Sequence, residues 1–149
     1  MSAVSVIGQF DPGLIESQSL CLVPMFVESV SAGFPSPAQG YEEARLDLNQ
    51  YCIKRPAATY MVKADGDSMK GIGIYPGDIL IVDRSLKAQH NDTVIAAVDG
   101  SLTVKTLELR PRVRLVPQNR CYSPIEFREG QELQIFGVVT HVLRTLKAG

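Results

Sequence analysis

Residues 93–109, TVIAAVDGSLTVKTLEL, decide the fold class of this chain. Two runs rich in apolar and β-branched residues, 93–98 and 101–109, flank the dipeptide Asp99-Gly100. An Asp-Gly pair between two such runs is the strongest short-range signal for a β-hairpin, because both residues tolerate a positive φ. Outward from this hairpin, short apolar runs closed by turn residues predict further strands at 59–64, 79–82, 112–117 and 133–146. The sequence therefore predicts a mainly β domain of six or more short strands with no long helix.

The first part of the chain differs in composition from the rest. Residues 1–45 mix Gly, Pro and Ser with isolated apolar residues, and 31–40 suits neither a helix nor a strand, because its prolines lack backbone donors. We therefore expect a flexible, extended N-terminal arm over residues 1–45 and a compact β-rich domain over residues 46–149. A short helix is expected at 45–53, ending near Pro56.

Length and charge limit the classes of function. A chain of 149 residues with 45% hydrophobic content is long enough for one domain with a core. The formal net charge is −1, and residues 1–40 contain acidic residues but no Lys or Arg. This balance argues against a protein that holds nucleic acid through phosphate contacts alone.

Cysteines and hydropathy indicate a cytoplasmic protein without a bound group. Cys21, Cys52 and Cys121 are widely spaced and form no C-x-x-C motif, so neither a disulfide framework nor a zinc site is expected. No apolar run approaches the roughly 20 residues that span a bilayer. The sequence thus predicts no metal, no cofactor and no membrane contact.

A second stretch, GDSMKGIGIYPGD at residues 66–78, surrounds one serine with glycines. Its glycine spacing fails both nucleotide-binding motifs, because Ile72 and Gly73 stand where a phosphate loop needs Lys and Ser or Thr, and Pro76 stands where a dinucleotide motif needs glycine. Such a turn either connects two strands or presents Ser68 beside backbone N–H groups that can bind a substrate oxygen. The loop alone leaves both interpretations open.

A serine hydroxyl needs a base to act as a nucleophile, and three residues are candidates. His90 lies in a polar turn and His141 in an apolar strand, where a histidine usually has a structural role. Strand alternation places Lys105 on the same face as Leu107 and Leu109. Burial there would lower the pKa of the amine and make it a general base, whereas a strand-edge position would let the amine reach water.

Several motifs together resemble the LexA/UmuD family of self-cleaving Ser/Lys proteins. The quoted GDSM at 66–69 and TVK at 103–105 are joined by GDILIVD at 77–83, AAVDG at 96–100, YSPI at 122–125 and FGVV at 136–139. The arm resembles the UmuD branch through AGFPSPA at 32–38 and DLNQ at 47–50. The similarity covers about residues 30–146.

The resemblance assigns roles to individual residues of this chain. The family's nucleophile falls on Ser68, its general-base lysine on Lys105, and its scissile bond on Ala32–Gly33. The backbone N–H groups of Ser68 and Met69 are then the expected oxyanion donors. One departure is Gly71, where some relatives carry an acidic residue.

The resemblance also implies a biological role. Cleavage would be stimulated by a RecA filament on single-stranded DNA during the SOS response. The shortened homodimer would then serve a UmuC-like Y-family DNA polymerase in error-prone translesion synthesis. No direct sequence-specific DNA binding is expected, since residues 1–40 leave no room for a helix-turn-helix domain.

Two other classes of function remain open at this stage. A non-catalytic dimeric interaction module would carry the same residues as a vestigial dyad, and a general protease would cleave other chains with turnover. Arg110, Arg112 and Arg114 are expected on one strand face, where they either meet an acidic partner or simply face water.

Overall fold

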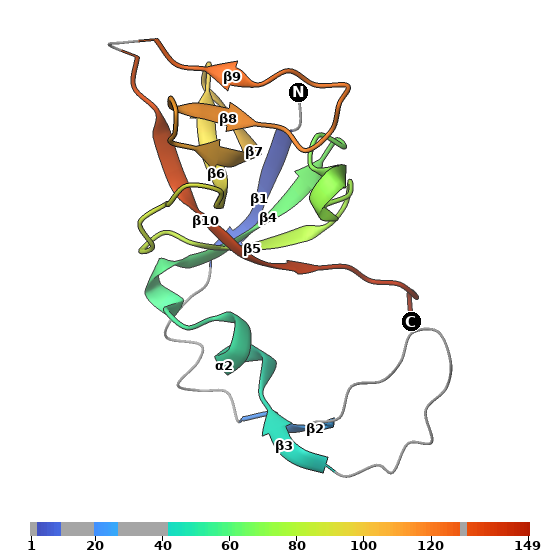
Figure 1. Cartoon of the computed structure of the whole chain (residues 1–149). Helices are drawn as coiled ribbons and strands as arrows, with labels where there is room; N and C mark the ends of the chain where they lie inside the picture. The colour runs from blue at the N-terminus through green and yellow to red at the C-terminus, as the bar shows by residue number, and fades with distance from the viewer. Residues whose placement is uncertain (1–2, 10–19, 27–41, 129–130) are drawn as a thin grey trace. The chain divides into compact units, whose positions relative to one another are not determined.

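A computed structural model of the protein describes residues 3–9, 20–26, 42–128 and 131–149 (Figure 1). The chain divides into two compact units, of which the larger comprises Met1–Asp11 with Arg55–Gly149 and the smaller Pro12–Lys54. This division differs from the boundary expected between residues 45 and 46. The proposed cleavage residues, Ala32 and Gly33, and the expected irregular segment 31–40 lie outside the described residues.

The larger unit is built on an eight-stranded sheet in which every neighbouring pair is antiparallel. In spatial order its strands are β1 (Ala3–Gln9), β4 (Thr59–Asp65), β5 (Ile79–Asp83), β10 (Gln134–Leu143), β6 (Thr93–Val98), β7 (Ser101–Glu108), β8 (Arg114–Val116) and β9 (Ile125–Glu126). The only helical turns described in this unit are the 3-10 helices η1 (Pro56–Ala58) and η2 (Lys70–Ile72). The predicted mainly β fold is confirmed.

The hairpin of β6 and β7 forms where the sequence predicted it. Val98 pairs with Ser101, and the two turn residues between them have positive φ, 49° at Asp99 and 79° at Gly100. This is the backbone geometry of a two-residue turn whose twist matches the twist of the flanking strands. The hairpin therefore fixes the register that places each residue of β7.

Strand β1 lies within the range expected to be an irregular arm. It pairs with the edge of β4, from Ala3 opposite Asp65 to Gln9 opposite Tyr60, and also lies against β7. The alternation over Val4, Ser5 and Val6 is too short to predict a strand alone. The exposed edge of β4 supplies the hydrogen-bonding partner that makes this segment a strand.

Both faces of the sheet are covered, which explains the nearly continuous apolar sequences of the central strands. Val94 and Ala96 of β6 belong to one buried cluster, whereas Ile95 belongs to the other. Leu80, Ile81 and Val82 of β5 are buried as well, as the sequence predicted. The core members on the first side are Tyr60, Val62, Ala64, Met69, Ile74, Leu80, Val82, Ile95 and Val104, and those on the second are Val94, Ala96, Val98, Leu107, Leu115 and Val138.

The smaller unit contains a two-stranded antiparallel sheet, β2 (Val23–Phe26) with β3 (Glu42–Leu46), followed by helix α2 (Leu48–Cys52). The helix begins three residues later than predicted because Asp47 is its N-cap. Its carboxylate accepts a 2.8 Å hydrogen bond from the Asn49 backbone N–H, which leaves the residues before it free to pair in β3.

The three arginines do not share a strand face, so that prediction is wrong. Strand β8 begins only at Arg114, and Arg110 and Arg112 lie in the connection before it. Arg114 Nε lies 2.7 Å from a Glu108 carboxylate oxygen, and Arg112 lies 3.8 Å from Glu126. Pairing with neighbouring acids favours a solvated surface over a site for an acidic partner.

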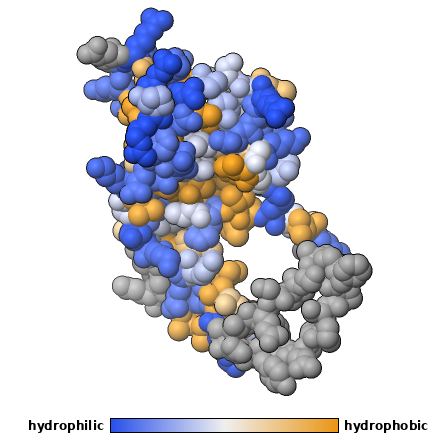
Figure 2. Space-filling model, viewed as in Figure 1, coloured by the Kyte–Doolittle hydropathy of each residue, from blue (hydrophilic) through white to orange (hydrophobic). Residues whose placement is uncertain are grey.

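Figure 2 shows a mostly hydrophilic face with a smaller hydrophobic area among the polar side chains. Within the described ranges, no helix has the length and apolar character needed to cross a membrane.

Gly137 provides a test of the packing between β10 and β5. A Cβ at this position would collide with Val82 Cγ1 and lie 3.2 Å from the Asp83 carbonyl oxygen. We expect Gly137→Ala to lower the free energy of unfolding by about 1–3 kcal/mol, measured by urea denaturation. In a Val82→Ala background the cost should shrink, because the colliding methyl is gone. An equal cost in both backgrounds would contradict this explanation.

Candidate active site

Ser68 lies in the turn that joins β4 to η2. The turn needs glycine at its start, where Gly66 has a φ of 91°, and at its end, where Gly73 has a φ of 86°. The Met69 carbonyl accepts hydrogen bonds from the backbone N–H groups of Ile72 and Ile74, each 3.2 Å long. Ser68 is fully buried, and Met69 belongs to the core. The turn is thus more than a solvent-exposed connection.

A segment more than 40 residues further along the chain forms hydrogen bonds with this turn. The Gln118 backbone N–H donates to the Ser68 carbonyl at 2.7 Å, and the Gln118 carbonyl accepts from the Gly71 N–H at 2.7 Å. A Cβ at Gly71 would lie 2.5 Å from the Gln118 carbonyl oxygen. Some relatives carry an acidic residue at the position of Gly71. In this chain glycine has a physical reason there, because only glycine allows the two backbones to approach so closely.

The other end of the turn is anchored to the end of β10. Arg144 Nε donates to a carboxylate oxygen of the buried Asp78 at 2.7 Å, and its terminal nitrogen donates to the Gly73 carbonyl at 2.7 Å. The guanidinium also stacks 4.5 Å from the centre of the Tyr75 ring. The hydrogen bond from Arg144 lowers the pKa of Asp78, so this carboxylate stays charged.

Lys105 lies in the middle of β7 and points its amine at Ser68. Its Nζ lies 3.1 Å from Ser68 Oγ, 2.8 Å from Thr103 Oγ1 and 3.1 Å from the Val104 carbonyl oxygen. Only 2% of the Lys105 surface is exposed, so the alternative in which the amine reaches water is wrong. Leu107, which alternation placed on the face of Lys105, is buried as well, whereas Leu109 beyond the end of β7 is exposed.

Burial lowers the pKa of the Lys105 amine from its ordinary 10.5 to about 8. Removal of water disfavours the ammonium ion, and the three bonded partners of this amine are a hydroxyl, a second hydroxyl and a carbonyl, none of them a carboxylate. With such a pKa roughly one amine in ten is neutral at pH 7. The site thus contains a base at neutral pH.

The two histidines have other partners. His90 Nδ1 accepts a 2.9 Å hydrogen bond from the Leu109 backbone N–H, and His141 Nδ1 lies 3.0 Å from Thr140 Oγ1. Of the three candidate bases, Lys105 is the one bonded to Ser68. The geometry therefore favours a serine–lysine pair over a serine–histidine arrangement.

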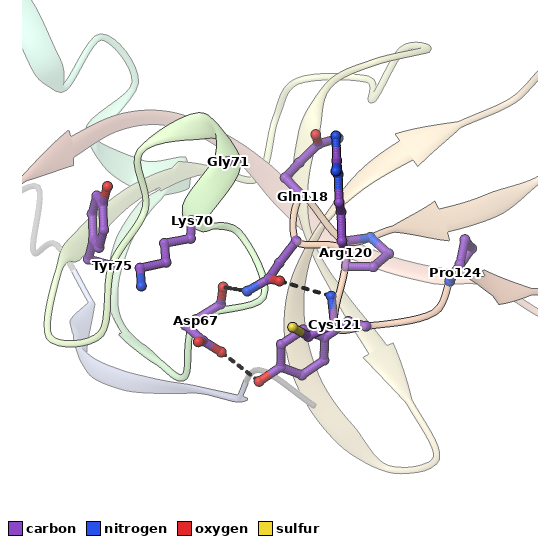
Figure 3. A pocket seen from close by; sticks show the side chains of 11 residues that line it. Asp67, Lys70, Gly71, Tyr75, Gln118, Arg120, Cys121 and Pro124 are labelled. Carbon is purple, nitrogen blue, oxygen red and sulfur yellow. Dashed lines mark hydrogen bonds between the residues drawn. The ribbon is translucent and has the colours of Figure 1, made fainter.

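An open cleft of about 890 Å³ lies beside the serine turn (Figure 3). Asp67, Lys70 and Gly71 line it from the turn, and Gln118 and Arg120 from the segment opposite. Sequence reasoning missed 117–121 as part of the site. The polar residues of segment 117–121 follow a short strand. No local sequence pattern indicates that they contact a turn some 50 residues earlier in the chain.

Metal ligands are not gathered in this site. Across the described part of the chain, no three His, Cys, Asp or Glu side chains lie together in a way that could hold an ion.

A serine on a tight turn, bonded to a buried lysine amine, defines a class of protein: a mainly β domain with a candidate Ser/Lys site. The Peptidase S24-like family matches residues 24–140 of this chain. The chain therefore belongs to the Peptidase S24-like family, and its assignment to the LexA/UmuD group is confirmed.

Three relatives show how much of the chain is shared. Protein SamA of Salmonella typhimurium is 56% identical over 117 residues, which cover 78% of this chain and 81% of SamA. Protein ImpA of Escherichia coli is 54% identical, covering 80% and 82% of the two chains. Protein MucA of Escherichia coli is 46% identical, covering 81% and 84%.

The buried amine predicts a dependence of stability on pH. The unfolded chain keeps the Lys105 proton up to pH 10.5, whereas the folded chain releases it near pH 8. Between these values the unfolded state binds more protons, so the free energy of unfolding rises with pH, by about 3 kcal/mol in total. Urea denaturation from pH 7 to 10.5 should show this rise as a growing difference between the wild type and Lys105→Met, because Cys52, Tyr60 and Tyr122, whose raised pKa values act in the opposite direction, are present in both.

The control for this measurement is Lys63→Met, which removes an exposed lysine of β4. Its profile should run parallel to the wild type. If Lys105→Met also ran parallel, the buried amine would not be the titrating group.

Proposed function

We propose that this protein is a serine peptidase that cleaves its own Ala32–Gly33 bond, with Ser68 as the nucleophile and Lys105 as the general base. One observation carries the proposal, the 3.1 Å hydrogen bond between Lys105 Nζ and Ser68 Oγ in a buried site. Membership of the Peptidase S24-like family supports it.

The three partners of the amine support its role as a base. A neutral amine has two N–H donors and one lone pair, and a carbonyl oxygen such as that of Val104 can only accept. With N–H bonds given to Val104 and Thr103, the lone pair is directed at the Ser68 hydroxyl. Neutral Lys105 is then placed to take the proton as Ser68 Oγ attacks the Ala32 carbonyl carbon.

The remaining steps use the same groups. The backbone N–H groups of Ser68 and Met69 stabilise the oxyanion; among the described residues neither donates another hydrogen bond. The Lys105 ammonium gives its proton to the departing Gly33 nitrogen, and a water molecule, deprotonated by Lys105, then hydrolyses the Ala32–Ser68 ester. The products are residues 1–32 and 33–149, and no metal takes part.

Burial of Ser68 supports a tethered substrate. A peptide must displace the groups that cover the serine before it can react. A segment of the same protein has a high effective concentration, which lowers the cost of this displacement relative to a free chain. Twelve residues, the separation of Gly33 from residue 45, reach about 40 Å when fully extended, a length sufficient for the site of the same chain or of a second copy.

The family resemblance supports a role in SOS mutagenesis. We propose that a RecA filament on single-stranded DNA stimulates cleavage, and that the processed chain, as a cytoplasmic homodimer, serves a UmuC-like Y-family DNA polymerase in translesion synthesis. The likeness to SamA, ImpA and MucA over about four fifths of each chain supports this branch of the family over the repressors.

The proposal is tested by the intact mass of the purified protein, followed over time from pH 7 to about pH 10. We expect loss of residues 1–32, about tenfold faster at the upper end, with half the maximal rate near pH 8, where Lys105 loses its proton. Ser68→Ala should stay intact at every pH, and Lys105→Ala should lose both the reaction and its pH dependence.

Lys63→Ala serves as the matched control and should cleave like the wild type. An unchanged mass in a folded wild-type sample would overturn the proposal and favour the non-catalytic interaction module. Turnover of many added peptides by one wild-type chain would instead indicate a general protease.

A further inference from the structure

We propose that Asn119 is a positioning residue for the oxyanion site, because it fixes the peptide plane that carries the Ser68 N–H group. The inference rests on the proposed function, in which this N–H group binds the oxyanion. Asn119 lies in the segment after β8, 51 positions beyond Ser68 in the chain, and was not expected to take part.

The Asp67 backbone carbonyl accepts two hydrogen bonds, the shorter from Asn119 Nδ2 at 2.9 Å and a longer one from the Lys70 backbone N–H at 3.2 Å. This carbonyl belongs to the same peptide unit as the Ser68 N–H, and in a trans peptide the two groups point in opposite directions. Fixing the carbonyl therefore also fixes the direction in which the Ser68 N–H points.

The neighbouring peptide plane is held in the same way. The Ser68 carbonyl, which shares its plane with the Met69 N–H, accepts the 2.7 Å hydrogen bond from the Gln118 backbone. Two adjacent residues of one segment thus hold the carbonyl ends of both proposed oxyanion donors. A hydrogen bond accepted by a carbonyl also polarises the N–H of its own peptide group, which makes it a stronger donor.

Asn119 is itself held in place. Its Oδ1 accepts a 3.0 Å hydrogen bond from the Cys121 backbone N–H. Since one partner is an N–H group and the other a carbonyl, only one orientation of the amide satisfies both. Figure 3 shows these bonds beside the labelled Asp67 and Cys121. The side chain is therefore a rigid bridge between its own turn and the serine turn.

A separate hydrogen bond to Asp67 offers an internal comparison. Tyr122 donates its hydroxyl to the Asp67 carboxylate at 2.6 Å, and so contacts the side chain but no peptide plane. If the peptide plane is what matters for the reaction, loss of the Asn119 bond should reduce cleavage more than loss of the Tyr122 bond.

The test is the rate of self-cleavage of Asn119→Asp in the full chain. Aspartate keeps the oxygen that accepts from Cys121 but loses the donor to the Asp67 carbonyl. Removing an oxyanion donor outright costs roughly 100- to 1,000-fold, so a misdirected donor should cost about tenfold at every pH. In the uncharged variant Asn119→Ala the pH of half-maximal rate should stay at the wild-type value, because no charge is added near Lys105. Tyr122→Phe should lose less than threefold.

A second readout uses a fluorophosphonate, whose phosphoryl oxygen occupies the oxyanion position of serine hydrolases. Its labelling of Ser68 should slow in Asn119→Asp in parallel with cleavage, while the free energy of unfolding shows that the domain is intact. If Asn119→Asp does not fold, Asn119→Ala takes its place, since it also lacks the donor but adds no charge.

The outcomes separate this inference from the proposed function. Wild-type rates in Asn119→Asp, or a shifted pH of half-maximal rate in the uncharged Asn119→Ala, would overturn the role of Asn119 while leaving the Ser68 mechanism intact. A wild-type chain that does not cleave, or Ser68→Ala that does, would overturn both.

Discussion

The burial of one lysine amine is the constraint on which the rest of the structure depends. Moving the Lys105 amine out of water costs about 3 kcal/mol in its charged form, judged from its lowered pKa. The domain tolerates this because the amine has three oxygen partners and because core residues fill both faces of the surrounding sheet. The same removal from water lowers the pKa of the amine, so that it can act as a base near neutral pH. At Lys105 the domain thus gives up folding stability and gains a side chain that can accept a proton.

The serine turn is rigid because distant parts of the chain support it. The 118–122 segment bonds to its first half, and Arg144 at the end of β10 bonds to its second half through Gly73 and Asp78. A turn with several glycines would otherwise have many conformations. A reaction that needs two N–H groups and a hydroxyl in fixed positions requires this support, since small displacements of such groups reduce rates strongly.

The site and its proposed substrate are suited to a reaction that happens once per chain. A fully buried serine is poorly accessible to free peptides, whereas a tethered arm gains from proximity. In such a system the protein does not need a deep recognition pocket, because the covalent connection replaces much of the binding energy. In the proposed reaction only the small fraction of neutral amine can act at neutral pH, which leaves room for acceleration by a partner.

The sequence by itself determined the fold class, the β6–β7 hairpin and the identity of Ser68 and Lys105 as candidates, because turn chemistry and strand alternation act between near neighbours. Only the tertiary structure decided that Lys105 is buried instead of reaching water, that 1–45 contributes a strand to the sheet, and that Arg110, Arg112 and Arg114 do not share a face. It also brought Gln118 and Asn119 to the serine turn. These contacts join residues about 40 to 60 positions apart, so they depend on sheet register and loop packing, which no local pattern in the sequence records.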